Sequence, residues 1–262
     1  VRCFDDPNVV HVSAQPDPRE DIAVINVELA LADLQQLERK IERLGSEVKG
    51  NKKLQPVLDL AQTLKDHLAQ GLPASKFVES GSELFQDLHR EMRFLTAKPL
   101  IYVANVDEDC LSAENPYLEQ VKQIGIEQSV EVVVLCAELE QEILDMSLEE
   151  RKEYLALAGA EVSGLDQVIR KSFEMLHLIS FFTFNQKETR AWNIPYGSTA
   201  PQAAGAIHTD FERGFIRAEV IPFDVFDKYG SHAAVKSAGL MRLEGKEYIV
   251  QDGDVIYFRF NV

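Results

Sequence analysis

The stretch TFNQKETRAWNIPYGSTAPQAAGAIHTDFERGFIRAEVIPF, from Thr183 to Phe223, decides the fold of the last third of the chain. It contains short β-prone runs separated by turn residues, and the closing segment QDGDVIYFRFNV adds one more apolar strand. The turn signals are Tyr196-Gly197, Glu212-Arg213-Gly214 and Asp252-Gly253. A helical pattern over 225–238 interrupts the strands. Together these features predict a small α+β domain, compatible with a β-grasp, over residues 179–262.

Two apolar runs further upstream predict a buried parallel sheet. The first is LIYVA at 100–104 and the second is VEVVVL at 130–135. A helical pattern at 116–124 lies between them, and an acidic helical pattern at 139–157 follows. Alternation of apolar strands with helices is typical of α/β proteins. An amphipathic helix over 166–178 then leads into the strand-rich region.

A helical region precedes this sheet. After a short apolar run at Val9–Val12, which predicts a strand or strand end, a helix is predicted from Asp21. Apolar residues step by three and four from Val27 to Val48, and again from Leu54 to Leu68, which is the spacing of a coiled-coil seam. The intervening Gly-Asn pair predicts that the two helices pack as an antiparallel hairpin. A third helix is expected to start at a capping box opened by Ser80.

Composition and charge limit the classes of function. The 262 residues contain 45% apolar residues, enough for two domain cores, and 27 Lys and Arg stand against 43 Asp and Glu. Residues 179–262 hold 9 of these cations and 10 of the anions, so about −15 of the net charge of −16 lies in the first 178 residues. An acidic body disfavours binding to a phosphate backbone, so the near-neutral C-terminal region is the better candidate for contact with RNA.

Cysteine usage and hydropathy point to a cytoplasmic protein. The chain has three cysteines, Cys3, Cys110 and Cys136, and no CxxC motif. This pattern is typical of reduced thiols and not of a disulfide framework or a zinc site. No apolar stretch approaches the roughly 20 residues of a membrane span, and no signal peptide is visible. We therefore expect a cytoplasmic location and no membrane partner.

The run Asn105-Val106-Asp107-Glu108 follows directly on the first predicted strand. Ligands of parallel α/β sheets bind at the carboxyl ends of strands, and an Asn amide can pair with a purine edge. The run is similar to the guanine-specific NKxD motif, but a longer Glu replaces the Asp that accepts from guanine. Two interpretations stay open: Asn105 binds a base, or it merely caps the turn after the strand.

Residues that bind nucleotide phosphates are missing from this sequence. A phosphate-binding loop needs GxxxxGK[ST] between a strand and a helix, and no such string occurs, nor does a DxxG after a strand. The six histidines include no HExxH. These 262 residues alone are therefore expected to have no catalytic residues and no dedicated metal ligands.

Three strings together resemble the YchF/Obg-like ATPase family, translation-associated P-loop NTPases with a C-terminal TGS domain. They are KPLIYVANVDED at 98–109, RAWNIPYGSTAPQAAGAIHTDFERGFIRAEVI at 190–221, and EGKEYIVQDGDVIYFRFNV at 244–262. The resemblance implies a partial parallel sheet of a P-loop NTPase (G domain) with a helical coiled-coil insertion and a β-grasp, ubiquitin-like TGS domain. The implied domains are a G-domain remnant at 1–20, the insertion at 21–95, the rest of the G domain at 96–178, and the TGS domain at 179–262.

The resemblance also implies a function and a set of site residues. Family members carry NxxE and prefer ATP, which implies that the intact protein binds and hydrolyses ATP with Mg²⁺, through phosphate-binding elements upstream of Val1. The implied base-binding residues are Asn105, Val106, Glu108 and Cys136. The ribosome or rRNA is the implied partner, with no DNA expected.

The expected RNA or ribosome contacts are basic residues at the hairpin turn and in the C-terminal region. They are Lys52, Lys53, Lys187, Arg190, Arg213 and Arg217. Scattered surface charges explain the four C-terminal residues equally well. The alternative function is a non-catalytic module that binds the ribosome or RNA without turnover.

Overall fold

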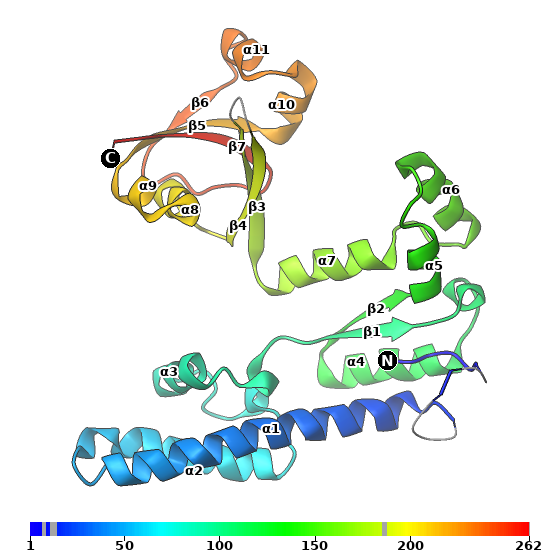
Figure 1. Ribbon diagram of the computed structural model, residues 1–262, viewed down its shortest axis with the longest axis vertical. Helices are drawn as coiled ribbons and strands as arrows, with labels where there is room; N and C mark the ends of the chain where they lie inside the picture. Colours follow the sequence, from blue (N-terminus) through cyan, green and yellow to red (C-terminus); the bar gives the residue numbers. More distant parts are fainter. Residues whose placement is uncertain (7–8, 11–14, 185–187, 262) are drawn as a thin grey trace. The chain divides into compact units, whose positions relative to one another are not determined.

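The computed structural model describes residues 1–6, 9–10, 15–184 and 188–261 (Figure 1). Its contacts divide the chain into two compact units, Val1–Ile169 and Arg170–Val262. No helix among the described residues has both the length and the apolar character needed to cross a bilayer.

A helical hairpin forms one end of the first unit. Helices α1 (Pro18–Glu47) and α2 (Gln55–Ala69) are joined through the short 3₁₀ turn η1 (Lys52–Leu54), and they lie side by side as the spacing predicted (Figure 1). Leu37 of α1 and Leu64 of α2 are both fully buried in their shared core. Helix α1 begins earlier than predicted because the Asp17 carboxylate caps the backbone N–H groups of residues 19 and 20.

Helix α3 (Glu83–Met92) completes the core of the hairpin with its apolar face. The prediction that Ser80 caps this helix was wrong. Ser82 is the capping residue, and its hydroxyl accepts a 3.1 Å hydrogen bond from the N–H of Phe85. The capping-box spacing favoured Ser80, which has Glu83 three residues on, whereas Ser82 has Phe85 at that offset and caps the helix through its hydroxyl alone.

A buried carboxylate closes the base of the hairpin. Asp33 of α1 is 1% exposed. It accepts hydrogen bonds from the N–H groups of Leu95 and Thr96, at 2.7 and 2.8 Å, and from the Thr96 hydroxyl at 2.7 Å. These hydrogen bonds hold Leu95 and Thr96 against α1 just before the chain enters the sheet.

Strands β1 (Ile101–Asn105) and β2 (Glu131–Leu135) pair in parallel, as predicted, with Asn105 opposite Leu135. The predicted strand at Val9–Val12 was wrong for its described part, because Val9 and Val10 are exposed and outside any strand; residues 11 and 12 lie outside the described ranges. The segment that pairs with β1 is Val1–Cys3, where the N–H of Cys3 donates to the carbonyl of Asn105 at 2.8 Å. A more N-terminal and shorter segment thus replaces the expected strand.

Helices pack around these two strands. Helix α4 (Pro116–Gln128) contacts both strands and also the N-terminal half of α1. The predicted single helix at 139–157 is two helices, α5 (Ala137–Glu142) and α6 (Leu148–Leu157), because Ser147 and Glu150 form a capping box that starts the second one. Helix α7 (Gly164–Met175) follows and runs across the boundary between the two units.

Within the described residues of the second unit, five strands form a sheet in the order β4-β3-β7-β5-β6. Only the β3–β7 pair is parallel in this sheet. The strands are β3 (Leu178–Phe184), β4 (Thr189–Pro195), β5 (Phe215–Pro222), β6 (Arg242–Glu244) and β7 (Asp254–Phe260). One apolar core lies between this sheet and the helix that follows β4.

Four helices accompany this sheet: α8 (Ala200–Ile207), α9 (Thr209–Arg213), α10 (Phe223–Tyr229) and α11 (His232–Ser237). The sequence analysis predicted no helix at 200–207, but Thr199 and Gln202 form a capping box that starts α8. Helices α10 and α11 replace the predicted helical pattern at 225–238, which is interrupted at Gly230 in the left-handed region (φ 69°).

Candidate nucleotide-base site and C-terminal surface

Asn105 is held in one orientation at the carboxyl end of β1. Its side-chain oxygen accepts a 2.9 Å hydrogen bond from the N–H of Ala137, in the turn that follows β2. Among the described residues, its amide nitrogen has no hydrogen-bond partner. The oxygen therefore stabilises the neighbouring turn, while the nitrogen remains able to donate to a ligand.

Val106 helps to hold the ends of β1 and β2 together at this edge. Its side chain is 2% exposed, and its N–H already donates to the carbonyl of Leu135 at 2.9 Å. This bond extends the pairing of β1 and β2 by one residue beyond Asn105. The two strand ends are thus held together just below the turn.

Cys136 and Glu108 lie at the same edge and differ in exposure. Cys136 is 2% exposed, and its sulfur accepts from the N–H of Leu139 at 3.5 Å as the cap of α5. Burial raises the pKa of this thiol, and the Glu138 and Glu108 carboxylates add to that rise against the hydrogen bonds from the backbone. Cys136 is therefore a neutral packing residue, whereas Glu108 is exposed at the start of η4 (Glu108–Leu111). The structure brings the predicted base-site residues to one sheet edge.

Asn115, which was not among the predicted site residues, also supports this edge. Asn115 is 4% exposed and caps α4 through hydrogen bonds from the N–H groups of Tyr117 and Leu118. Its amide nitrogen donates to the carbonyl of Cys3 at 2.7 Å, which fastens the N-terminal segment to α4. The Asn-Pro pair at the start of a helical pattern is the signal that predicts such a cap.

No metal centre is evident at this edge. Among the residues that the structure describes, no three His, Cys, Asp or Glu side chains are grouped so as to hold a metal ion. The three cysteines are free thiols, and burial raises the pKa of Cys3 to about 11.

The predicted RNA contacts that the structure describes belong to other elements. Lys52 and Lys53 are exposed in η1, at the turn of the helical hairpin. Arg190, on strand β4, is exposed and its guanidinium lies 4.2 Å from the centre of the Trp192 ring. Lys187 lies outside the described residues.

Arg213 and Arg217 are both exposed, at the end of α9 and on β5. Arg217 lies directly opposite Arg259 of β7 in the register of the sheet. The sequence analysis missed Arg259, whose Nε donates to Glu219 at 3.0 Å. The strand order β4-β3-β7-β5 separates Arg190 from Arg217, so these arginines do not form one cluster.

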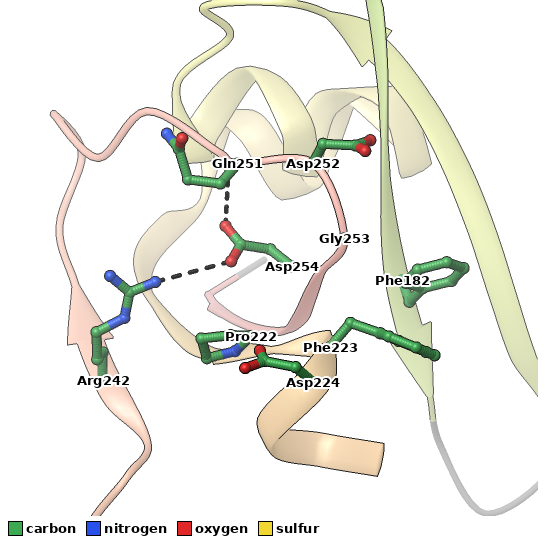
Figure 2. Close-up of a pocket in the computed structure, with 9 residues that line it drawn as sticks. All are labelled: Phe182, Pro222, Phe223, Asp224, Arg242, Gln251, Asp252, Gly253 and Asp254. Atoms are coloured by element: carbon green, nitrogen blue, oxygen red, sulfur yellow. Dashed lines mark hydrogen bonds and ion pairs between the residues drawn. The ribbon is translucent and has the colours of Figure 1, made fainter. Parts of the chain in front are cut away.

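Two hollows open on the C-terminal unit. One, of about 620 Å³, includes Arg190, Trp192 and Phe211 in its lining. The other, of about 560 Å³, is shown in Figure 2, where Arg242 and the backbone of Gln251 point toward the buried Asp254 carboxylate. Of the predicted contact residues that the structure describes, none lines this second hollow, where Asp254 pairs with Arg242 and with the N–H of Gln251.

Comparisons with known proteins agree with this architecture. The family model YchF-GTPase_C, described as "Protein of unknown function (DUF933)", matches residues 178–261. Over 263 residues, the chain is 46% identical to the "Ribosome-binding ATPase YchF" of Escherichia coli O157:H7, covering all of this chain and 72% of that protein. The protein of the same name from Bacillus subtilis (strain 168) is 42% identical over 267 residues, with the same two coverages.

A solved structure shows the same fold. The chain superposes on the "Structure of the Schizosaccharomyces pombe YchF GTPase" with a TM-score of 0.78 and 30% identity, covering 99% of this chain and 70% of that one. The sequence relatives and this structure support the same assignment across nearly the whole length of the chain. The chain belongs to the YchF family.

Proposed function

We propose that the intact protein is an ATP-preferring, ribosome-associated NTPase that hydrolyses ATP. The observation that carries the nucleotide preference is Glu108, which replaces the Asp of the guanine-specific motif, and Asn105 presents its amide nitrogen to a purine at the same sheet edge. The relatives named ribosome-binding ATPase YchF support the activity and the partner.

In this proposal Asn105 donates to the purine through its amide nitrogen. Val106, Cys136 and Glu108 form the rest of the base site, the first two as buried supports and Glu108 as the exposed side chain that disfavours guanine. A Glu extends one methylene further than an Asp, so its carboxylate cannot occupy the position that accepts from the two guanine hydrogens.

The proposed base site at Asn105 fits the base of ATP and offers no groups that would bind its phosphates. The sequence holds no GxxxxGK[ST] string, so the phosphates and Mg²⁺ would be bound by parts of the intact protein outside these 262 residues. Mg²⁺ would neutralise the charge that develops on the transferring phosphoryl group. The role of the present residues is to bind and orient the base.

We further propose the domain boundaries 1–20, 21–95, 96–178 and 179–262, with the last domain a β-grasp of the TGS type. The five-stranded mixed sheet with α8 against its apolar core supports this assignment. The helical hairpin would be a coiled-coil insertion between two parts of the G domain.

We also propose contacts with ribosomal RNA through Lys52 and Lys53 of the hairpin and through Lys187, Arg190, Arg213 and Arg217 of the C-terminal domain. The charge distribution supports the four C-terminal contacts, because the acidic charge of the chain lies almost wholly in its first 178 residues. Lys52 and Lys53 are supported by their exposure at the hairpin turn. A ribosome partner fits a cytoplasmic location, and neither DNA nor a membrane is needed.

The experiment that tests the proposal uses the intact protein. Affinities for ATP and GTP, ATP hydrolysis and co-sedimentation with ribosomes are measured on one preparation. Tighter ATP binding, turnover and sedimentation support the proposal. Sedimentation with ribosomes in the absence of any ATP binding would instead favour the alternative, a non-catalytic ribosome- or RNA-binding module.

A further inference from the structure

The turn that orients Asn105 is also fastened on its other side. Glu140, in α5, lies one helical turn after Cys136 and Ala137. Its carboxylate accepts a hydrogen bond from the Ser163 hydroxyl at 2.7 Å and from the N–H of Gly164 at 2.6 Å. These two donors form the start of α7, so one side chain joins the turn to that helix.

The start of α7 packs closely against the end of β2. A Cβ on Gly164 would lie 2.2 Å from the Cβ of Leu135, closer than any real contact. The helix therefore begins directly against the last residue of β2, which is the residue that pairs with Asn105. Ser163 is 5% exposed, and its hydroxyl also accepts from the N–H of Asp166 as the cap of α7.

The electrostatics of this contact favour a carboxylate. Hydrogen bonds to an ionised acceptor are stronger than those between neutral groups. A negative charge at a helix N-terminus is further stabilised by the unpaired N–H groups of the first turn. The Glu140 contact is consequently a firm attachment between α5 and α7.

We propose that Glu140 is a positioning residue for base recognition. Its carboxylate holds α5 against α7, which fixes the Ala137 N–H that in turn orients the amide of Asn105. Loss of this attachment frees the turn, so the Asn105 amide samples other rotamers and the base is held less tightly. This inference rests on the proposed function, because it assumes that Asn105 meets a base.

The test compares ATP with inorganic tripolyphosphate, both with Mg²⁺, on the intact protein. Tripolyphosphate has no base, so a positioning role predicts that Glu140→Ala weakens ATP binding about tenfold and leaves tripolyphosphate binding unchanged. Glu140→Gln keeps one oxygen acceptor and is expected to recover most of the ATP affinity. The matched control is Glu153→Ala, which removes an exposed carboxylate from the neighbouring helix α6.

Hydrogen exchange gives a second readout that needs no nucleotide. Glu140→Ala should speed exchange of the Ala137 amide relative to Glu153→Ala, with exchange in α4 unchanged. Unchanged exchange at Ala137, or equal losses of ATP and tripolyphosphate affinity, would overturn the inference. If Glu140→Ala does not fold, Ser163→Ala, which removes one of the two hydrogen bonds, is judged by the same criteria. Failure of the parent protein to bind ATP would overturn the proposed function, while the exchange result would still decide whether Glu140 fixes the turn.

Discussion

The side-chain oxygen of Asn105 and the backbone N–H of Ala137 are joined by a 2.9 Å hydrogen bond across the ends of two parallel strands. Because the oxygen is used in this way, the amide group cannot flip without losing a bond. The NH₂ group is therefore the part of Asn105 that can still donate to a ligand. An acceptor such as N7, which adenine and guanine share, suits this donor, so discrimination between the two bases must come from elsewhere.

The first prediction is that Glu108 supplies this discrimination. In the intact protein, Glu108→Asp should lower the ratio of ATP to GTP affinity about tenfold, or about 1.4 kcal/mol, because the shorter carboxylate can accept from guanine. The measurement is competition between the two nucleotides. Glu114→Asp, another exposed position in the same unit, is the control. Tenfold tighter binding of GTP than ATP by the parent protein would contradict the premise.

Restoring the lysine of the guanine-specific motif at Val106 is a poorer test. The side chain of Val106 is 2% exposed, so Val106→Lys would place an ammonium group in the core of the first unit. Burial of an unpaired charge costs several kcal/mol, and loss of the fold would mask any change in nucleotide preference.

The second prediction concerns these 262 residues expressed alone. They should release no phosphate from ATP above background, because the lysine and magnesium ligands that stabilise phosphoryl transfer do not occur among them. Phosphate release is measured against the intact protein as a positive control. Turnover that Asn105→Ala abolishes would show that the activity belongs to this chain and would refute the prediction.

The third prediction concerns ribosome binding. The double variant Arg213→Ala/Arg217→Ala should weaken co-sedimentation and make its logarithmic salt dependence shallower by about 1 to 2, as expected for loss of two phosphate contacts. A second variant, Lys52→Glu/Lys53→Glu, should act in the same direction if the hairpin turn takes part.

A variant without the charged side chains of Lys98 and Lys152, which are exposed in the first unit, is the control for a loss of positive charge elsewhere on the chain. The electrostatic account fails if both test variants sediment like the parent at moderate salt. Contacts of the acidic body, or apolar contacts, would then have to supply the binding.

The fourth prediction concerns stability of the helical hairpin. Asp33→Ala removes the buried carboxylate that accepts from the N–H groups of Leu95 and Thr96, so it should lower the free energy of unfolding by about 3 kcal/mol. Asp33→Asn keeps one oxygen and should cost roughly half as much. Urea unfolding followed by helical circular dichroism measures this, with the exposed Asp66→Ala as control. Equal midpoints for Asp33→Ala and Asp66→Ala would rule out the role.

The fifth prediction concerns pH and the second unit. Burial opposes ionisation of Glu219, but the hydrogen bond and charge of Arg259 outweigh it, so the pKa of this carboxyl lies below its ordinary value of 4.5. A lowered pKa in the folded state stabilises the fold above pH 4.5, and that contribution is lost as pH falls through the folded value. Glu219→Gln should therefore be less stable than the parent at pH 6. The difference in free energy of unfolding should become smaller toward pH 3.

Trp192, the single tryptophan, reports unfolding of this unit by fluorescence. Glu247→Gln, a change at an exposed carboxylate of the same unit, is the matched control. If the difference in free energy of unfolding between Glu219→Gln and the parent stays constant from pH 6 to pH 3, ionisation of Glu219 does not contribute to stability.

Much of the fold was predictable because its signals are local and periodic. The spacing of apolar residues identifies the buried faces of α1 and α2. Apolar composition alone identifies the paired strands β1 and β2. Helix α8 was missed because its sequence, APQAAGAI, contains Pro and Gly, which usually mark turns. Its capping box and the burial of its alanines against the sheet outweigh these residues.

The candidate site was predictable only in part. Asn105 and Glu108 follow a strand and match a spaced motif, so the sequence indicates them directly. Glu140 and Arg259 bond to residues 23 and 40 positions away, and no local pattern reports such contacts. Asp33 bonds to residues more than 60 positions away from within a regular helix, where an acidic side chain normally indicates solvent.

The attachment of Asp33 to Leu95 and Thr96 brings together two points that are 62 and 63 residues apart in the chain. The chain between these points forms the hairpin and α3, which share one apolar core. Adding or removing whole heptads at the far end of α1 and α2 would therefore change the reach of the hairpin and leave the entry to β1 where it is. The distance over which this protein extends Lys52 and Lys53 can thus change without any compensating change at the sheet edge that carries Asn105.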